Sequence, residues 1–253
     1  MHRFFVEATL LTPSLATILL PDKLAHQVRD VLRLVVGEQL ILLDNSGDEI
    51  LCAVTKTGRA GVEVQILERR TDKGEPSTRI VLCQGLLKTA RFEWILEKGT
   101  ELGVTTFAPT LCRRSMSGLE DAGPAKIQRW QRIVQEAAEQ CGRARIPTLL
   151  PIRSFPQAID AIPDSALALI PWEEERDLSL RTALADAVPN SQQAEPLTVV
   201  VFIGPEGGFA AEEIALARQR NVQVVTLGQR VMRAETAALV AVANVLYTLE
   251  MGS

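Results

Sequence analysis

Three glycines and a proline interrupt the apolar sequence near the C-terminus, in the stretch FIGPEGGF at residues 202–209. The β-branched run VVVFI at residues 199–203 leads into them, and a helical pattern begins a few residues later. Glycine has no Cβ, so the backbone here can approach a ligand closely and adopt positive φ angles, while Pro205 fixes one turn position. The backbone N–H and C=O groups of this loop are therefore candidate ligand-binding groups.

The charge of this loop limits the kind of ligand that it could hold. The loop matches neither G-x-x-x-x-G-K-[ST] nor G-x-G-x-x-G, and it has no lysine to meet a phosphate. Its acidic residue, Glu206, argues against a polyphosphate and suits a positively charged ligand, such as the sulfonium of S-adenosylmethionine. A second interpretation stays open, in which the glycines only make a tight turn and Glu206 or Glu212 complements the helix N-terminus.

A second polar segment, LGQRVMRAETAA at residues 227–238, lies between a predicted strand and a predicted helix. Arg230 and Arg233 carry guanidinium groups that can stabilise negative charge on a substrate oxygen. Glu235 or Thr236 is placed to cap the helix, so an ordinary capped helix with flanking charges explains the segment equally well. The alanines that follow permit close helix packing, either within one subunit or across a dimer.

The elements that carry these loops alternate along the chain from residue 79 onward. Strands are predicted at residues 79–87, 105–112, 166–174, 197–208 and 222–228, and helices at 90–104, 124–142, 211–221 and 233–250. This alternation predicts a parallel α/β sheet. Ligands of such sheets bind beyond the carboxyl ends of the strands, so the segments 171–173, 204–208 and 227–230 are expected to converge on one pocket.

The first 72 residues follow a different pattern. Two apolar runs flank the turn at residues 45–48, and GVEVQILE at residues 61–68 alternates like a half-buried strand. Apolar residues at helical spacing between 22 and 39 predict one helix, with Gly37 as its stop. We predict a small β-barrel domain over residues 1–72 and an α/β domain over residues 73–253, joined through the polar stretch 69–78.

Composition indicates a soluble globular protein, with 47% hydrophobic and 23% charged residues among 253. The formal net charge of −4 means that any nucleic-acid site must come from local clusters of Arg and Lys. Four scattered cysteines and two histidines suggest neither a zinc site nor a disulfide framework. We expect a cytoplasmic protein without metal, signal peptide or membrane anchor.

The two C-terminal motifs together resemble those of the RsmE family of 16S ribosomal RNA uridine-N3 methyltransferases, in the SPOUT superfamily. The resemblance extends over essentially the whole chain, in the order expected for that family. The supporting stretches are RFFV at 3–6, VLRLVVGEQLILLDNSG at 31–47, LEKGTELGV at 96–104, RS at 114–115 and RWQRIVQEAAEQCGRARIP at 129–147.

This resemblance implies an α/β domain with a mostly parallel sheet and a C-terminal trefoil knot, preceded by a PUA-like RNA-binding barrel. It also implies a homodimer with active sites at the subunit interface, and S-adenosylmethionine as the methyl donor. The acceptor is expected to be N3 of a uridine in 16S ribosomal RNA, in the decoding region of the small ribosomal subunit. Two alternatives stay open: a related methyltransferase acting on another RNA such as tRNA, or a non-catalytic RNA-binding ribosome-assembly factor.

The motif positions carry over as site residues. Expected cofactor contacts are Ile170, Pro171, Gly204, Pro205, Glu206, Gly207, Leu227, Gly228, Val231, Met232, Thr236 and Ala237. RNA contacts predicted from the clustering of basic residues are Arg3, Lys23, Arg29, Arg33, Arg113, Arg114 and Arg143.

Arg233 is the predicted catalytic cation, with Arg230 or Arg114 as second choice, and Glu235 is either a proton acceptor or a helix cap. One departure from the family pattern concerns the helix after the glycine loop. Ala210 stands where the family often has Ser or Thr, so half of a capping box with Glu213 is missing, at a cost of about 1 kcal/mol.

Overall fold

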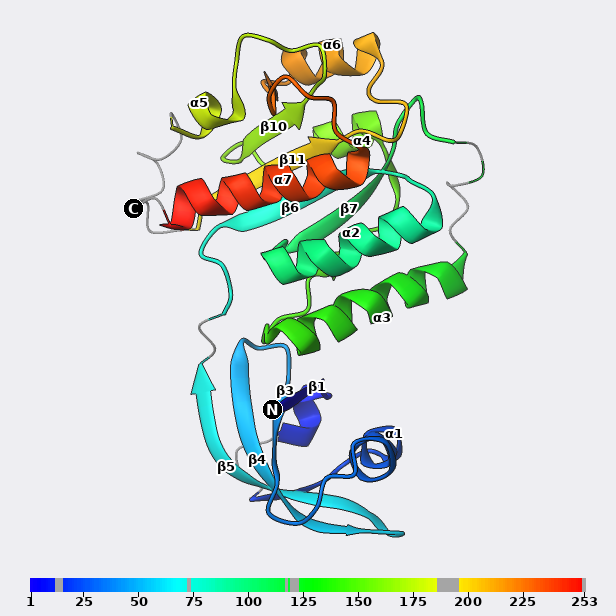
Figure 1. Cartoon of the computed structure of the whole chain (residues 1–253), viewed down its shortest axis with the longest axis vertical. Helices are drawn as coiled ribbons and strands as arrows, with labels where there is room; N and C mark the ends of the chain where they lie inside the picture. Colours follow the sequence, from blue (N-terminus) through cyan, green and yellow to red (C-terminus); the bar gives the residue numbers. More distant parts are fainter. Residues whose placement is uncertain (12–15, 72–73, 117, 119–122, 186–195, 252–253) are drawn as a thin grey trace. The chain divides into compact units, whose positions relative to one another are not determined.

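The computed structural model describes residues 1–11, 16–71, 74–116, 118, 123–185 and 196–251. The chain forms two compact units (Figure 1): Met1–Glu75 with Ala138–Ile146, and Pro76–Ala137 with Pro147–Ser253. The contacts of residues 138–146 thus group them with the first unit, although they come late in the sequence. The predicted boundary between residues 72 and 73 lies outside the described residues.

The first unit is built around a five-stranded sheet with the strand order β1-β3-β4-β5-β2. β1 pairs with β3 in parallel, and the other neighbouring strands are antiparallel. Among the described residues no pairing of β1 with β2 closes this sheet, so the barrel stays a prediction. The strands span His2–Phe5 (β1), Thr17–Leu19 (β2), Gln39–Leu43 (β3), Asp48–Gly58 (β4) and Gly61–Thr71 (β5).

The predicted hairpin of this unit is confirmed, because β3 and β4 are antiparallel neighbours. Asn45 and Gly47, in the turn between them, have φ angles of 64° and 98°. Both are residue types that tolerate this left-handed region. Inward side chains of β3, β4 and β5, such as Leu42, Ile50 and Val64, form a buried core.

The helix of the first unit is shorter than predicted. It runs through α1 (Asp22–His26) and a π-helical turn, η2 (Gln27–Val31), and Arg33 then adopts a left-handed φ of 57°. This reversal lets Leu34 pack against the core cluster. The predicted stop at Gly37 is therefore wrong; Gly37, with a φ of 94°, forms a turn ahead of β3.

The described residues of the second unit form a seven-stranded sheet in which every pair is parallel, as predicted. The strand order is β12-β10-β11-β6-β7-β8, and β9 also pairs with β7. The strands span Arg79–Gly85 (β6), Thr106–Leu111 (β7), Thr148–Leu149 (β8), Arg153–Ser154 (β9), Leu167–Pro171 (β10), Thr198–Ile203 (β11) and Gln223–Val225 (β12).

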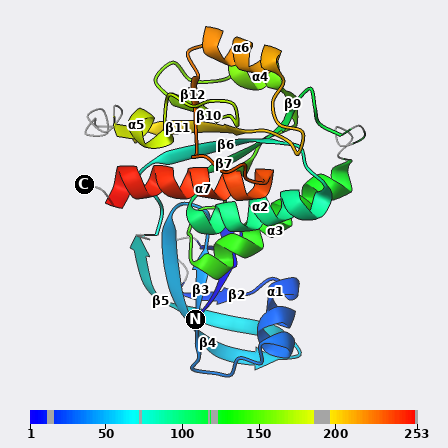
Figure 2. The same ribbon diagram turned by 45° about the horizontal axis from the view of Figure 1, so that its top comes forward.

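Helices cover both faces of this sheet (Figure 2). Their bounds are Thr89–Leu102 (α2), Pro124–Cys141 (α3), Phe155–Asp160 (α4), Leu180–Ala185 (α5), Ala211–Gln219 (α6), Ala234–Leu246 (α7) and Tyr247–Met251 (η4). On one face, Phe155 of α4 and Ile214 of α6 pack against Phe202 of β11. α2 and α7 pack together on the other face, and α7 contacts β6 and β11.

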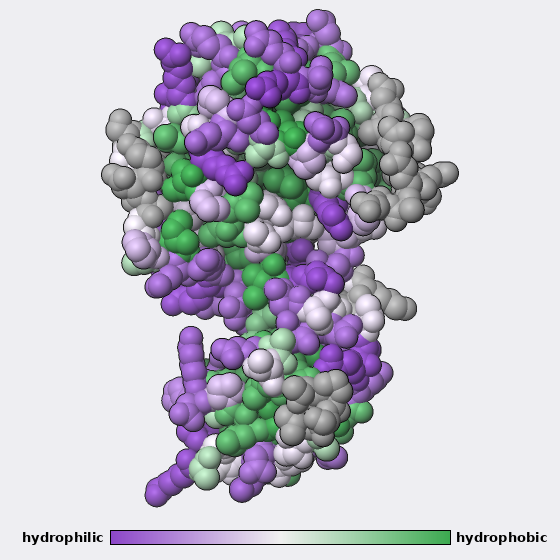
Figure 3. Space-filling view, turned by 180° about the vertical axis from the view of Figure 1, so that it is seen from behind, coloured by the Kyte–Doolittle hydropathy of each residue, from purple (hydrophilic) through white to green (hydrophobic). Residues whose placement is uncertain are grey.

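The surface view in Figure 3 shows hydrophilic side chains interspersed with smaller apolar areas. Among the described residues, none of the helices has the length and apolar character needed to cross a membrane.

Candidate cofactor site

The glycine loop at residues 204–208 joins the buried end of β11 to α6. Gly208 has a φ of 68°, and its N–H donates to the carbonyl of Pro205 at 2.9 Å. The loop also lies against the end of β6, where a Cβ on Gly85 would be 2.5 Å from the backbone nitrogen of Pro205. The backbone path therefore requires glycine at two sequence-distant positions.

The start of α6 is only half capped. Ala210 offers no side-chain acceptor, as predicted, but the Glu213 carboxylate accepts the N–H of Ala210 at 2.9 Å and the N–H of Arg113 at 2.8 Å. Glu213 is 8% exposed, so these two hydrogen bonds satisfy a nearly buried charge. The carboxylate half of the capping box thus also ties the segment after β7 to the start of α6.

The three predicted strand ends converge on adjoining cavities. A cavity of about 270 Å³ is lined by the whole glycine loop together with Pro171, Met232 and Arg233. A smaller cavity of about 90 Å³ beside it is lined by Leu227, Gly228 and Arg230. Both cavities share the walls Pro171, Glu173, Val231, Met232 and Ala237.

Ten of the twelve expected cofactor contacts thus line one cavity or the other. Ile170 does not, because its side chain on β10 is fully buried in the hydrophobic core. Thr236 is exposed on α7 and lines neither cavity. Arg233 is exposed at the rim of the larger cavity, where its guanidinium is available to a substrate.

The predicted cap of α7 is wrong. The helix begins at Ala234 with Arg233 as its N-cap residue, and within the described part of the chain this N-cap makes no side-chain capping hydrogen bond. Glu235 instead forms an ion pair with Arg91 of α2, with 3.7 Å between Nε and Oε1. Glu235 also does not line the cavity, which places it behind Arg91 and not against a ligand.

Two charged residues that line this site were not among the predicted site residues. Arg91 lines the larger cavity from α2, and its Nη1 lies 3.6 Å from Oε1 of Glu206. Glu173 lines both cavities, and a Cβ on Gly208 would be 2.7 Å from its Oε1. Glu173 belongs to the segment 171–173, which was predicted to reach the pocket, although no contact role was assigned to it. Nothing in the α2 pattern distinguished Arg91.

A turn at Glu175 holds the segment that carries Glu173. Backbone N–H groups of Asp177, Leu178 and Arg176 donate to the Glu175 carboxylate and hold its pKa below the ordinary value. Arg218 of α6 adds an ion pair at 3.0 Å. This wall of the cavities is therefore attached to α6, as the glycine loop is.

The basic residues of the first unit that were predicted to contact RNA differ in their exposure and in their ion pairs. Lys23 and Arg33 are exposed. Arg29 binds Asp30 in a bidentate pair at 2.9 and 2.6 Å, which lowers the pKa of that carboxyl to about 2, and it also donates to the Gly58 carbonyl. Arg3 is paired with Glu49 at 3.0 Å.

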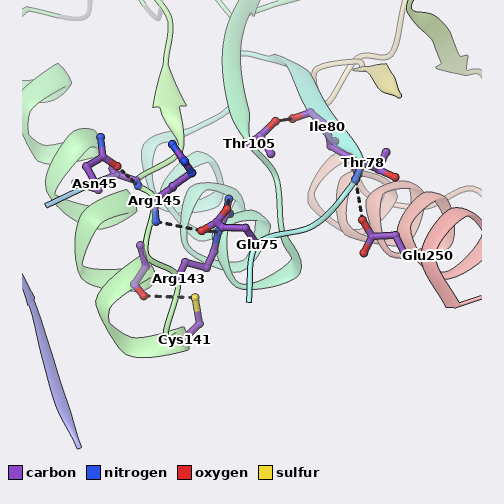
Figure 4. A network of polar contacts seen from close by, with 11 residues as sticks. Asn45, Glu75, Thr78, Ile80, Thr105, Cys141, Arg143, Arg145 and Glu250 are labelled. Carbon is purple, nitrogen blue, oxygen red and sulfur yellow. Dashed lines mark hydrogen bonds and ion pairs between the residues drawn. The ribbon is translucent and has the colours of Figure 1, made fainter. Parts of the chain in front are cut away.

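The structure contradicts the prediction of Arg143 as an RNA contact. Its side chain is 5% exposed and is paired with Glu75 at 2.8 Å (Figure 4). The Glu75 carboxylate also accepts the N–H of Arg145 at 3.1 Å. Arg143 is therefore a structural cation, because a buried guanidinium in an ion pair is not accessible to a phosphate.

Arg113 and Arg114, in the second unit, are exposed beside the glycine loop. Nη1 of Arg114 donates to the carbonyl of Gly207 at 3.0 Å. Among the described residues, no group of three or more His, Cys, Asp or Glu side chains is arranged to hold a metal ion.

Comparison with known proteins assigns this fold and site to a class. A family model for an RNA methyltransferase domain matches residues 74–246, and a model for an RNA methyltransferase PUA domain matches residues 20–67. The α/β unit and its glycine-loop site are thus those of an RNA methyltransferase.

Individual relatives narrow this class. Proteins named ribosomal RNA small subunit methyltransferase E are similar to this chain: one from Synechocystis is 34% identical over 93% of this chain and 74% of its own length. The one from Bacillus subtilis is 29% identical over 99% of this chain and 98% of its own length. A crystal structure of the Neisseria gonorrhoeae enzyme of that name, bound to S-adenosyl methionine, is 30% identical, covers 98% of both chains and gives a TM-score of 0.83. The chain belongs to the ribosomal RNA small subunit methyltransferase E family, which confirms the family predicted from the sequence.

Proposed function

We propose that this protein transfers a methyl group from S-adenosylmethionine to N3 of a uridine in the decoding region of 16S ribosomal RNA. The observation that carries the proposal is the shared cavity, which is lined by both the glycine loop and Arg233. The Neisseria gonorrhoeae relative, crystallised with S-adenosyl methionine, supports the choice of donor.

The residues of the cavity fit this donor. The walls combine backbone groups of the glycine loop with apolar side chains such as Met232 and Ala237, which suit an adenosine group. The carboxylates of Glu173 and Glu206 line the same cavity and complement the positive charges of the sulfonium and the amino group. When bound, S-adenosylmethionine supplies an electrophilic methyl group.

The residues of this chain must then orient the acceptor base and stabilise the negative charge that develops on it. Uracil N3 carries a proton at neutral pH, and its loss leaves negative charge on N3, O2 and O4. The exposed guanidinium of Arg233 at the cavity rim is placed to stabilise that charge, with Arg230 beside the smaller cavity and Arg114 over Gly207 as second choices. Glu235 is not proposed as the proton acceptor, because it does not line the cavity.

The acceptor uridine must be unpaired or turned out of its stack, because N3 lies on the Watson–Crick edge. We propose that the first unit holds the RNA backbone through its exposed cations Lys23 and Arg33, with contributions from Arg29 and Arg3, which are already engaged in ion pairs. Charge reversal at Lys23 and Arg33 should lower RNA affinity and flatten its salt dependence. Unchanged affinity and an unchanged salt slope would rule out this surface.

The family resemblance further supports two proposals about architecture and assembly: a trefoil knot in the C-terminal part of the second unit, and a homodimer with the active sites at its interface. Exposed apolar side chains on the C-terminal segment, including Val231 at 84% and Tyr247 at 66%, are consistent with such an interface. Sedimentation of the purified protein at several concentrations tests the dimer.

The reaction is tested by single-turnover methyl transfer with Arg233→Ala at saturating RNA and donor. Removing a cation aimed at the developing charge should lower the rate by roughly 100-fold or more. A rate close to that of the unmodified protein would remove Arg233 from the mechanism. Transfer to bulk tRNA in preference to a 16S ribosomal RNA fragment would show a different RNA substrate, and failure to bind the donor would show a non-catalytic RNA-binding factor.

A further inference from the structure

Arg91 lines the larger cavity and is held by ion pairs that lie beyond hydrogen-bond distance. Its two ion-pair partners, Glu206 and Glu235, lie at 3.6 and 3.7 Å, beyond hydrogen-bond distance. Within the described part of the chain its guanidinium makes no direct hydrogen bond. Arg129 on the neighbouring α3, by contrast, donates two hydrogen bonds to the Glu93 carboxylate, from Nε and Nη2. The N–H groups of Arg91 are therefore available to a ligand.

The backbone beneath Arg91 is fixed. Phe92, the next residue of α2, is 1% exposed and packs on the Trp130 ring with 4.5 Å between the ring centroids. α2 also packs along α7, the helix that begins at the cavity. The Arg91 side chain is 40% exposed, so it can turn within the cavity while its Cα stays in place.

Glu235 is the more buried of the two ion-pair partners of Arg91. The Glu235 side chain is 15% exposed, and its Oε2 is fully buried without a hydrogen-bond partner among the described residues. A carboxylate in that position is costly unless a cation stays near it. Arg91 supplies that charge. Glu206, at 27% exposure on the glycine loop, is the more solvated partner of Arg91.

We propose that Arg91 binds an oxygen of the acceptor nucleotide, with Glu235 as the buried residue that positions it. The Arg91 guanidinium is shared between the carboxylates of Glu206 and Glu235. Glu206 belongs to the part of the cavity wall that fits the methyl donor. When RNA enters, Arg91 keeps Glu235 on its Nε edge and turns its Nη groups from Glu206 to the nucleotide. Arg91 is thus a second acceptor-side cation, distinct from Arg233. This inference rests on the proposed function for the identity of the RNA.

The test compares Arg91→Ala, Glu235→Gln and the double variant with the unmodified protein, and uses Arg132→Ala as the matched control. Arg132 is also a helix arginine of the second unit paired with a glutamate, Glu136, but it lies outside the cavity lining. Two quantities are measured: the dissociation constant of a transcribed decoding-region fragment of 16S ribosomal RNA, and kcat/KM for its methylation. Titration calorimetry gives the affinity for S-adenosylmethionine separately.

We expect Arg91→Ala to weaken RNA binding by roughly tenfold and to lower kcat/KM by roughly 100-fold, with donor affinity unchanged within about twofold. Arg132→Ala should change none of these quantities. If the nucleotide oxygen belongs to a phosphate, the salt slope of RNA binding falls by roughly 0.7. If it belongs to the base, the slope stays constant while the affinity falls.

The positioning role of Glu235 has its own signature. Glu235→Gln should lower kcat/KM by roughly tenfold in the unmodified protein and have no further effect when Arg91 is already alanine, because the two residues act as one unit. Additive losses would overturn the positioning role, since a merely structural contribution of Glu235 would persist without Arg91.

Unchanged RNA affinity and unchanged kcat/KM in Arg91→Ala would overturn the proposal, and so would a loss of donor affinity as large as the loss in kcat/KM. An inactive unmodified protein would instead contradict the proposed function. The RNA-binding comparison would then still decide the role of Arg91.

Discussion

Gly85 offers the most direct way to move the glycine loop without touching its sequence. An alanine Cβ at this position would lie 2.5 Å from the backbone nitrogen of Pro205 and 2.8 Å from the carbonyl carbon of Gly204. Ordinary contact begins at 3.4 Å, so the step from 2.5 to 3.4 Å requires a displacement of about 0.9 Å. The neighbour is backbone, so no side-chain rotation can absorb the shift.

The free-energy cost of Gly85→Ala follows from this geometry. Overpacking of this kind destabilises a fold by about 1–3 kcal/mol. The displaced segment also forms part of the cavity wall, and a donor held by backbone groups loses affinity when those groups move. We expect S-adenosylmethionine to bind at least roughly tenfold more weakly, which corresponds to about 1.4 kcal/mol.

Titration calorimetry and thermal unfolding together measure the effect of Gly85→Ala. Gly58→Ala is the matched control, because a Cβ at Gly58 meets no atom within 4 Å. The control should retain donor affinity and show only a small change in melting temperature. Donor affinity of Gly85→Ala within about twofold of the unmodified protein, with an unchanged melting temperature, would refute the argument that this contact places the loop.

Three further predictions concern the surroundings of the site and the first unit. Glu213→Gln should lower the free energy of unfolding by about 1–3 kcal/mol in urea titrations, because a nearly buried carboxylate that accepts two backbone N–H groups is lost; an unchanged midpoint would contradict this. Arg143→Ala should destabilise the protein by about 3–5 kcal/mol in the same assay, since it leaves Glu75 without its buried partner; a loss below about 0.5 kcal/mol would instead be typical of an exposed cation. The Arg129 guanidinium holds the pKa of Glu93 below its ordinary value. This ion pair therefore stabilises the fold above the unfolded pKa of about 4.3, and the contribution is lost as pH falls through the lower folded value. The advantage of the unmodified protein over Glu93→Gln should be below about 1 kcal/mol at pH 7 and shrink toward zero in acid, and an advantage that grows in acid would show the opposite linkage.

Sequence patterns were most informative where hydrophobic periodicity and glycine spacing decide the structure. The β-branched run at 199–203 is a central parallel strand, and the glycines after it make the turn that they predicted. The motif around Arg233 lines the same cavity, because the parallel strands β11, β10 and β12 bring their carboxyl ends to one edge of the sheet.

Long-range pairing explains what the sequence could not predict. Arg91 reaches the cavity only because α2 packs along α7, and no local pattern of α2 encodes that contact. Arg143 belongs to a basic cluster in the sequence, yet Glu75, 68 positions away, buries its charge. Glu235 and Thr236 suit a helix cap by type, but the helix starts one residue before Glu235, so both lie inside its first turn.

The central claim is that the cavity between the glycine loop and Arg233 carries out methyl transfer to RNA. Mass spectrometry of 16S ribosomal RNA treated with the purified protein and S-adenosylmethionine tests it most directly, by locating the added methyl group. One new methyl is expected, on N3 of a uridine in the decoding region. RNA that gains no methyl, or gains it on another base, would contradict it.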